Sequence, residues 1–200
     1  MLLLGRWEGN RLRWTCSDRI VGDPARTTRG LIEPTIAELA DGSILMIMRG
    51  SNDVLPDLPA HKWMSLSHDG GQTWMAPEPW TYDNGVAFHS PSACSQLIPH
   101  SDGRLLWMGN LNELNSRGNR PRYPLVIGEV DRSSGRLLRD SVTVIDDRRD
   151  GESDQLTLSN FYAREDRETG DLLLHMPRLF ARETDEGFSA DLLLQRIVLA

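Results

Sequence analysis

Arginine is the side chain of this sequence with the clearest capacity for chemistry, and that chemistry is the binding of anions. The 200 residues contain 22 lysines and arginines, and Lys62 is the only lysine among them. A guanidinium group binds a carboxylate through two parallel hydrogen bonds, a geometry that a lysine ammonium cannot offer. The composition has two explanations: a GC-rich genome that favours arginine codons, or arginines placed to bind carboxylates.

Three arginines lie close together in one expected loop, between Asn115 and Tyr123. They are Arg117, Arg120 and Arg122, and a small ligand cannot use all three, so at least one must face the solvent. The loop is therefore either a basic surface or a segment that gives one arginine to a binding site.

The spacing of the residues does not indicate a metal site, a phosphate-binding loop or a redox site. The histidines lack metal-ligand spacing, and no glycine-rich loop has the pattern that cradles a phosphate. Cys16 and Cys94 lie far apart, and we expect both to be small buried residues rather than a redox or metal pair. We therefore expect neither a metal nor a cofactor. The histidines are His61, His68, His89, His100 and His175.

The overall charge argues against nucleic acids and membranes as partners. The formal net charge is −7 and the pI is about 5.2, and an acidic chain is repelled by nucleic acid and by anionic lipid. Met1–Leu4 is too short an apolar run for a signal peptide, Arg6 interrupts it, and no stretch has the length of a transmembrane helix. We expect a cytoplasmic protein, or a secreted or periplasmic one if the true N-terminus lies upstream.

One tight turn is the clearest structural feature of the sequence. Residues 67–74 have the pattern Ser-x-Asp-x-Gly-x-Thr-Trp, which begins at Ser67. The Asp69 carboxylate can accept backbone N–H groups of its own turn, and Gly71 supplies a positive φ. Trp74 is expected to fold back and anchor the hairpin on a sheet. The motif is structural, so it predicts a fold rather than a reaction.

Similar hairpins recur with a period of roughly sixty residues. Gly42, Gly103 and Gly170 each follow a short β-run and precede an apolar one, and two β-runs joined by a glycine turn form a hairpin. A period of this length is typical of a β-propeller, in which each repeat is one four-stranded blade. An unrelated β-sandwich with similar hairpins is the alternative.

The repeats predict about three blades and no amphipathic helix. We expect residues 1–20 to form the outer hairpin of a preceding blade, 33–82 one blade, 90–146 a second, and 156–200 an incomplete third, with residues 74–81 and 136–145 among the strands. A closed propeller needs at least four blades. Either an N-terminal half of the ring is missing, or copies of the chain self-associate, because a half-ring would expose sheet edges and apolar faces.

These features together resemble the sialidase (neuraminidase) superfamily. The 67–74 turn is similar to the Asp-box of its BNR repeats, and residues 131–135 resemble a degenerate copy. The resemblance covers residues 25–200 and is to the C-terminal half of the catalytic domain. It implies an all-β, six-bladed sialidase-type β-propeller, of which this chain holds about three blades.

The resemblance also implies a site that binds a carboxylate. Glu33 opens an inner strand and Arg49 ends the next strand, as a glutamate and an arginine do in that family. Carried over, Glu33 is a catalytic residue that assists a tyrosine nucleophile, and Arg49 binds the substrate carboxylate. In that family a second substrate-binding arginine lies just before a strand of the following blade. In this sequence Arg122 is the loop arginine nearest to the corresponding strand, so the resemblance assigns this role to Arg122. A structural ion pair of Glu33 and Arg49 is the alternative.

The family's tyrosine nucleophile has no counterpart here. Leu158 stands at the tyrosine's place, and Tyr162 lies four residues further on. Asp154, in the same loop, is an alternative catalytic carboxylate, and a Glu33–Asp154 pair would give two-carboxylate glycosidase chemistry. The family's first arginine and its catalytic aspartate lie in the half that this sequence does not contain.

Three further residues occupy equivalent places at the mouth of the ring. His89 begins the inner strand of the second blade, as Glu33 does in the first, and could bind a sugar hydroxyl or act as an acid. A structural histidine is the alternative. Asn110 and Arg178 stand in their own blades where Arg49 stands in the first, so both are candidates to bind substrate.

The function that the resemblance implies is an exo-glycosidase that hydrolyses a terminal acidic sugar from a glycan substrate. A non-catalytic propeller that binds a glycan or a protein, and an inactive fragment, are the alternatives. Because the aspartate and the tyrosine are missing, we expect the isolated chain to be inactive on sialosides.

Overall fold

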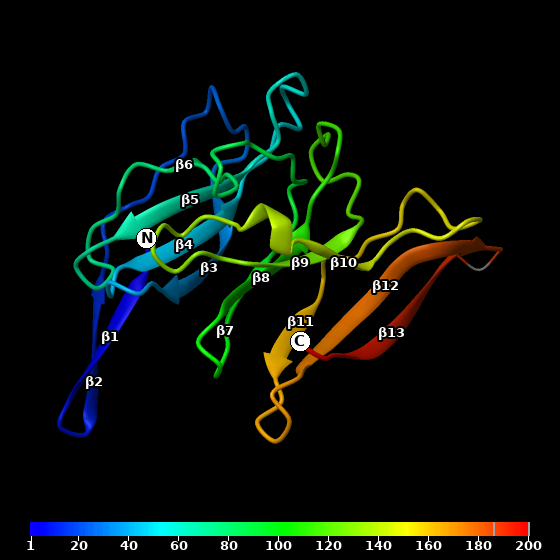
Figure 1. Cartoon of the computed structure of the whole chain (residues 1–200). Helices are drawn as coiled ribbons and strands as arrows, with labels where there is room; N and C mark the ends of the chain where they lie inside the picture. Colours follow the sequence, from blue (N-terminus) through cyan, green and yellow to red (C-terminus); the bar gives the residue numbers. More distant parts are fainter. Residues whose placement is uncertain (186, 200) are drawn as a thin grey trace.

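The computed structural model describes residues 1–185 and 187–199, and these residues form an all-β chain (Figure 1). The strands follow one another as antiparallel hairpins and form four separate sheets. The one helix in the described ranges is a short 3-10 helix at Arg139–Ser141. The expectation of an all-β chain is therefore confirmed.

An N-terminal hairpin and a four-stranded sheet come first along the chain. The hairpin pairs β1 (Leu3–Glu8) with β2 (Arg11–Cys16). The sheet has its strands side by side in chain order, and they are β3 (Ile32–Glu38), β4 (Ile44–Arg49), β5 (Lys62–Ser67) and β6 (Glu78–Pro79). A four-stranded meander of this kind is the building unit of a propeller blade.

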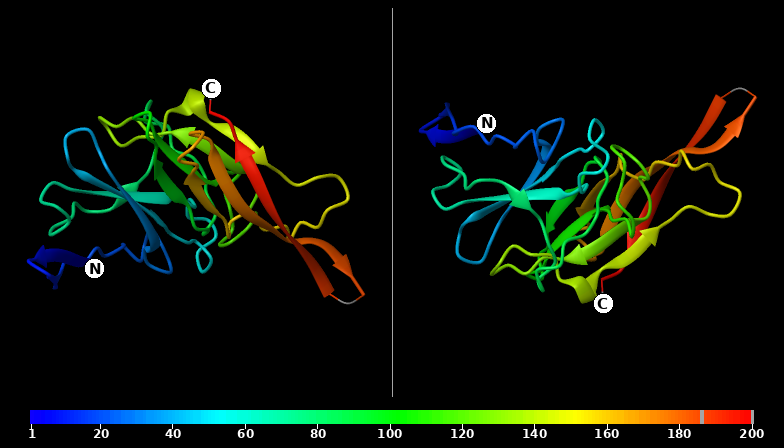
Figure 2. Two further views of the ribbon diagram at one scale, coloured as in Figure 1. Left: turned by 90° about the horizontal axis from the view of Figure 1, so that it is seen from below. Right: turned by 90° about the horizontal axis from the view of Figure 1, so that it is seen from above.

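Two further sheets complete the chain. The second sheet again follows chain order and contains β7 (Gln96–Pro99), β8 (Leu105–Asn110), β9 (Leu125–Glu129) and β10 (Thr143–Asp146). The third sheet contains β11 (Tyr162–Glu165), β12 (Leu172–Thr184) and β13 (Gly187–Ile197). The far end of the β12–β13 hairpin projects beyond the rest of the molecule (Figure 2).

Two expected strands are shorter than the sequence suggests. The strand expected over residues 74–81 is reduced to β6, because Pro77 and Pro79 have no N–H group to give to a ladder. Residues 136–145 hold the 3-10 helix, and strand β10 begins only at Thr143. The residue ranges expected for the individual blades remain a prediction.

The sheets stack face to face, so that alternate side chains of one strand enter different cores. On β4, Leu45 and Ile47 pack against the second sheet, whereas Met46 and Met48 pack against the N-terminal segment. Strand β8 divides its side chains in the same way between the first and third sheets. Because the side chains of a strand alternate between its faces, both middle sheets are buried on both sides.

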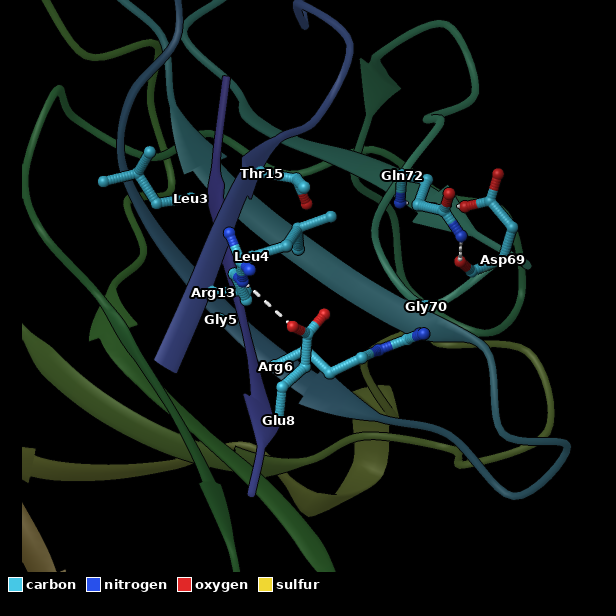
Figure 3. A pocket seen from close by; sticks show the side chains of 10 residues that line it. All are labelled: Leu3, Leu4, Gly5, Arg6, Glu8, Arg13, Thr15, Asp69, Gly70 and Gln72. Atoms are coloured by element: carbon cyan, nitrogen blue, oxygen red, sulfur yellow. Dashed lines mark hydrogen bonds and ion pairs between the residues drawn. The ribbon is translucent and has the colours of Figure 1, made fainter. Parts of the chain in front are cut away.

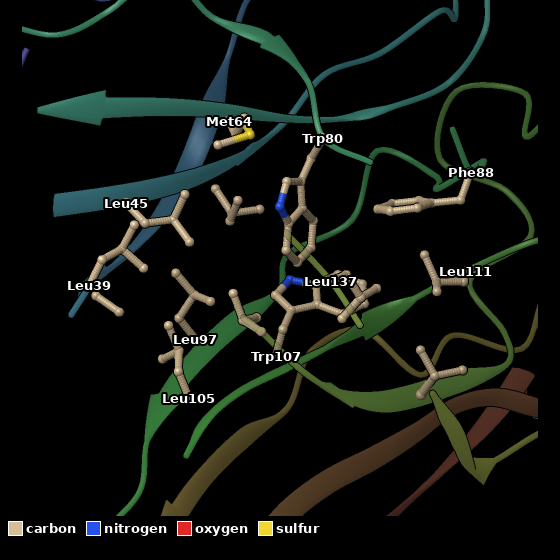
Figure 4. Close-up of a cluster of buried hydrophobic side chains, with 14 residues drawn as sticks. Leu39, Leu45, Met64, Trp80, Phe88, Leu97, Leu105, Trp107, Leu111 and Leu137 are labelled. Atoms are coloured by element: carbon tan, nitrogen blue, oxygen red, sulfur yellow. The ribbon is translucent and has the colours of Figure 1, made fainter. Parts of the chain in front are cut away.

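Aromatic side chains fill the space between the first and second sheets (Figure 4). Trp80 and Trp107 are fully buried, with ring centroids 5.2 Å apart and planes at 70°. The edge-to-face geometry suits the charge distribution of the two rings. Trp80 Nε1 donates to the carbonyl oxygen of Gly135 over 2.7 Å, which ties the end of the first sheet to the turn after β9.

The first strands of the three larger sheets lie next to one another, since β3 contacts β7 and β7 contacts β11. Hydrogen bonds between side chains and the backbone, rather than a continuous backbone ladder, join these strands. Thr35 Oγ1 accepts from the N–H of Leu97 over 2.9 Å. Gln96 donates to the carbonyl oxygen of Ala163 over 2.7 Å and accepts from its N–H over 2.9 Å. These contacts gather the N-terminal ends of β3, β7 and β11 in one place.

The turn after β5 is held by its aspartate, as the sequence predicts. Asp69 Oδ1 accepts from the backbone N–H groups of Gln72 and Thr73 at 3.0 and 2.9 Å, and Gly71 has a φ of 89°. Trp74 Nε1 donates back to the carbonyl oxygen of Gly71 over 3.0 Å. Hydrogen bonds from the Thr73 hydroxyl and backbone lower the pKa of Asp69 to about 2.

Large apolar side chains remain exposed at the two ends of the chain. Trp7 and Trp14 are 69% and 60% exposed on the N-terminal hairpin, and Leu192 and Leu194 are 72% and 64% exposed on β13. Proteins normally cover surfaces on which several large apolar side chains are exposed together. A missing part of the ring, or self-association, stays a prediction.

The substitution Asp69→Asn should lower the melting temperature at pH 7, because the amide cannot accept as many of the turn's N–H groups. The folded-state pKa is depressed from 3.8 to about 2. The stabilisation by Asp69 is therefore complete above pH 4 and is lost as the pH falls through about 2. Thermal unfolding of both proteins between pH 7 and pH 2 measures this difference.

The difference in melting temperature between wild type and Asp69→Asn should shrink toward the acid end of the series. Asp140→Asn is the control, because Asp140 is exposed and makes no side-chain hydrogen bond within the described residues. A constant difference across the whole pH range, or an equal effect of both substitutions, would refute this role of the carboxylate.

Candidate functional site

Six residues line an open pocket of about 290 Å³. They come from the first two strands of the first sheet and from the segments that precede β7, β9 and β11. The lining residues are Glu33, Arg49, Cys94, Arg122, Ser159 and Asn160. Three residues that the sequence predicts for the site are thus brought together from two sheet units: Glu33 and Arg49 from the first sheet, and Arg122 from the segment before β9 of the second.

Glu33 stands at a backbone irregularity that turns it toward Arg49. The register of β3 against β4 shifts between Ile32 and Thr35, and Glu33 has a φ of 50°. This left-handed conformation costs a non-glycine residue about 1–3 kcal/mol, and residues strained in this way cluster at functional sites. Arg49 Nη2 lies 2.8 Å from Glu33 Oε1, and the Glu33 side chain is 46% exposed. The carboxylate is therefore held by one partner and still open to a ligand.

Arg49 and Arg122 converge on one acceptor, the carbonyl oxygen of Ser92. Arg49 Nη1 donates to it over 2.8 Å and Arg122 Nη2 over 3.2 Å. The Nε atom of each arginine is buried and donates to no atom of the described residues. Burial and the nearby charge of Arg49 lower the pKa of Arg122, as expected of two cations held close together. Converging guanidinium groups with unpaired N–H groups form a site for an oxyanion.

Two residues that no motif singled out lie beside these arginines. Lys62 is fully buried, pairs in register with Arg49, and donates through Nζ to the carbonyl oxygen of Ala93. Cys94 lines the pocket, its thiol contacts the carbonyl oxygen of Ser159, and burial raises the pKa of the thiol. The signal that could have found Lys62 is its place at the start of the strand that follows Arg49.

The cysteines differ from the sequence-based expectation that both are buried. Cys16 is exposed at the end of β2, because the two-stranded hairpin has no layer that covers it there. Cys94 is only partly buried, because it stands at the pocket wall.

The residue at the place of the expected nucleophile points away from the pocket. Leu158 is fully buried among the side chains between the second and third sheets. Its neighbours Ser159 and Asn160 line the pocket instead. Tyr162 is exposed on β11 and does not line the pocket. No phenol hydroxyl therefore faces Glu33 among the residues that line this pocket.

Asn110 and His89 do not line the pocket either. Asn110 is fully buried, and its Nδ2 donates to the carbonyl oxygens of Arg122 and Pro124 at 3.1 and 2.9 Å. It fixes the backbone beside Arg122 rather than a ligand. His89 is half-buried and stacks on His61, with ring centroids 6.3 Å apart.

Arg178 and Asp154 lie away from the predicted site. Both terminal nitrogens of Arg178 are taken by buried carboxylates, since Nη1 lies 2.5 Å from Asp146 and Nη2 lies 2.5 Å from Glu152. Its expected place at the pocket is therefore not observed, because this ion triad holds Arg178 against the end of β10 and the segment that follows it. Asp154 is exposed, accepts from the side chain of Gln155, and does not line the pocket.

A larger pocket of about 470 Å³ lies between the N-terminal hairpin and the turn at Asp69 (Figure 3). Its ion pair, Arg13 with Glu8, has side chains that are 71% and 57% exposed. Exposed pairs of this kind contribute little and are easily replaced by water. The smaller pocket, whose cations are half-buried and converge, is the better candidate for specific chemistry.

The described residues hold neither a group of three metal-ligating side chains nor a long apolar helix. No three His, Cys, Asp or Glu side chains gather as a metal ion would require in these ranges. Likewise, none of the helical segments described has the length and apolarity that crossing a bilayer requires.

The substitution Arg178→Met should destabilise the fold by about 3–5 kcal/mol, because it leaves two buried carboxylates without their cation. Urea unfolding at pH 7 measures this loss. Arg182→Met is the matched control, since Arg182 is exposed on the same strand. Equal stability of the two variants would contradict the structural role of Arg178.

Comparison with solved structures shows the fold. The sialidase of Trypanosoma rangeli in complex with the inhibitor DANA has a TM-score of 0.54 at 14% identity, over 95% of this chain and 26% of that one. The intramolecular trans-sialidase of Ruminococcus gnavus has a TM-score of 0.51 at 19% identity, over 94% and 36%. A xylan β-1,4-xylosidase of Bacillus halodurans has a TM-score of 0.52 at 15% identity, over 92% and 32%.

The chain spans only part of the proteins that it resembles. It covers between 26% and 40% of the length of the first similar structures, and no curated protein matches it. At this level of identity the likeness concerns the fold, which is that of a sialidase-type β-propeller. Residues 7–162 match the BNR repeat-like domain, so the chain belongs to that family of β-propeller repeats.

Proposed function

We propose that the chain forms the part of a sialidase-like glycosidase that binds the carboxylate of a terminal acidic sugar on a glycan. The observation that carries the proposal is the convergence of Arg49 and Arg122 on one oxygen beside Glu33. Two guanidinium groups with unpaired N–H groups suit the planar carboxylate of a sugar acid. The similar Ruminococcus gnavus enzyme was solved with oseltamivir carboxylate, a ligand of that charge.

In this proposal the arginines bind and Glu33 assists the reaction. Arg49 orients the Glu33 carboxylate through their 2.8 Å contact, and its guanidinium group lies in the pocket wall where it can bind the ligand carboxylate. A partly exposed carboxylate at the pocket can activate a nucleophile or a water molecule at the sugar carbon. The exposed position of Asp154 makes a Glu33–Asp154 pair a weaker basis for catalysis.

The catalytic step belongs to a complete ring rather than to these residues alone. Hydrolysis of a glycoside needs an acid for the leaving oxygen and a nucleophile or base for the sugar carbon. The pocket lining offers one carboxylate, at Glu33, and a core leucine occupies the place of the expected tyrosine. The isolated chain should therefore bind without turnover.

A non-catalytic glycan-binding propeller is the second candidate, and the burial of Leu158 favours it. A binding protein needs the two arginines but no nucleophile. The two candidates share the carboxylate site and differ only in whether bound sugar is released from its aglycone.

The substitutions Arg49→Met and Arg122→Met should each weaken binding of the methyl α-glycoside of N-acetylneuraminic acid. Loss of one charge-assisted hydrogen bond costs about 1.5–3 kcal/mol, which corresponds to roughly ten- to hundredfold in affinity. Titration calorimetry on each variant measures the change, and the methyl ester of the same ligand shows whether the carboxylate is what is recognised.

Arg120→Met is the matched control for Arg122→Met, because Arg120 is exposed in the same loop and does not line the pocket. It should bind like wild type. The proposal fails if the wild-type chain binds the acid and its methyl ester equally, or if all three substitutions leave the affinity unchanged.

The isolated wild-type chain should release no aryl alcohol from an aryl sialoside above the buffer rate, because the residues that line the pocket include neither a second carboxylate nor a tyrosine beside Glu33. A fluorogenic assay checks this, with Glu33→Gln measured in parallel. Release by wild type that disappears in Glu33→Gln would show that the chain is itself an enzyme, contrary to this expectation.

A further inference from the structure

Lys62 is a buried cation directly behind the pocket. Its side chain is fully buried, and its place on β5 is opposite Arg49 on β4. Its ammonium group donates to the carbonyl oxygen of Ala93. Within the described residues it forms no ion pair with a carboxylate, and a buried charge without a paired opposite charge is costly.

Three cationic side chains donate hydrogen bonds to two successive backbone carbonyl oxygens behind the pocket. The Ser92 oxygen accepts from Arg49 and Arg122, and the Ala93 oxygen accepts from Lys62. The backbone of residues 92–93 is thus fixed from both sides, by the two pocket arginines and by the buried lysine. A shift of the Ala93 carbonyl would move the Ser92 carbonyl and with it the two guanidinium groups.

Positive charge is in excess around the pocket. Arg49, Arg122 and Lys62 lie near one another, whereas Glu33 is the one carboxylate of the pocket lining. Glu33 is 46% exposed, so its field at Lys62 is weakened by solvent. An anion that enters the pocket would supply the missing negative charge.

We propose that Lys62 is a positioning residue for the anion site: it holds the 92–93 backbone toward the two arginines, and its charge raises the affinity of the pocket for an anionic sugar. This inference rests on the proposed function and adds a group that does not touch the ligand. It assigns to the only lysine of the chain a role that no sequence motif indicates.

The charge of Lys62 changes within an accessible pH range. Burial lowers the pKa of Lys62 to about 7, with the charges of Arg49 and Arg122 acting in the same direction and the charge of Glu33 opposing. The ammonium form, and the affinity that depends on it, is complete well below pH 7. Both are lost as the pH rises through that value.

Four other charged or titratable groups face Lys62 from the elements packed around it. They are Arg49 on β4, Glu33 on β3, Cys94 before β7 and Arg122 before β9. Burial raises the pKa of the Cys94 thiol, so this group stays neutral near pH 7. A sugar carboxylate remains ionised from pH 5.5 to pH 8.5, so the ligand contributes no titration of its own.

The test is titration calorimetry of the methyl α-glycoside of N-acetylneuraminic acid with wild type and Lys62→Met between pH 5.5 and pH 8.5. Wild-type affinity should fall by on the order of tenfold across this range, as one nearby charge is lost. Lys62→Met should bind weakly with no such pH dependence, since methionine fills the space without the charge.

A second measurement needs no variant and so covers the case in which Lys62→Met does not fold. Calorimetry of wild type at pH 7.5, in buffers of different ionisation enthalpy, should show proton uptake on binding, because the bound anion favours the ammonium form. Binding without proton uptake and with an affinity that does not change with pH would overturn the role of Lys62 and leave the proposed function intact. Absence of binding at every pH would overturn the proposed function as well.

Discussion

The carbonyl oxygen of Ser92 is shared by two arginines from different sheet units, and the candidate site depends on that shared contact. Arg49 ends β4 in the first sheet, Arg122 precedes β9 in the second, and the two N–O distances are 2.8 and 3.2 Å. Two like charges repel, so an acceptor between them is what allows both to point into one pocket. A ligand carboxylate would meet guanidinium groups that are already oriented, which lowers the entropy cost of binding.

The stacking of the sheets makes this concentration of charge possible. The apolar clusters on both faces of the middle sheets hold β3, β7 and β11 together at their N-terminal ends. The strained φ of Glu33 and the burial of Lys62 both act against stability. Such costs are tolerated where a surrounding core determines the backbone, and they are typical of sites that bind a ligand.

Much of the fold follows from local sequence signals, and less of the site does. Glycine turns and alternating apolar residues predict the hairpins, and the hydrogen-bonding capacity of Asp69 predicts its turn, because both depend on residues close in sequence. Glu33, Arg49 and Arg122 were reached through the resemblance to a family. The ion pairs of Arg178 with Asp146 and Glu152 cannot be predicted from the sequence, because these partners are distant in sequence and carry no motif. No local signal marks Lys62 either, since only its strand pairing and its burial reveal its place beside the pocket.

The most direct test of the carboxylate site is an NMR titration of the arginine Nε–H signals with the methyl α-glycoside of N-acetylneuraminic acid. The Nε atoms of Arg49 and Arg122 are buried and have no partner in the part of the chain that the structure describes, whereas the guanidinium of Arg178 is held by two carboxylates. The account predicts that the signals of Arg49 and Arg122 shift together with one dissociation constant, and that the Arg178 signal stays in place. A titration in which neither pocket arginine responds to the ionised sugar, or in which Arg178 responds instead, would contradict it.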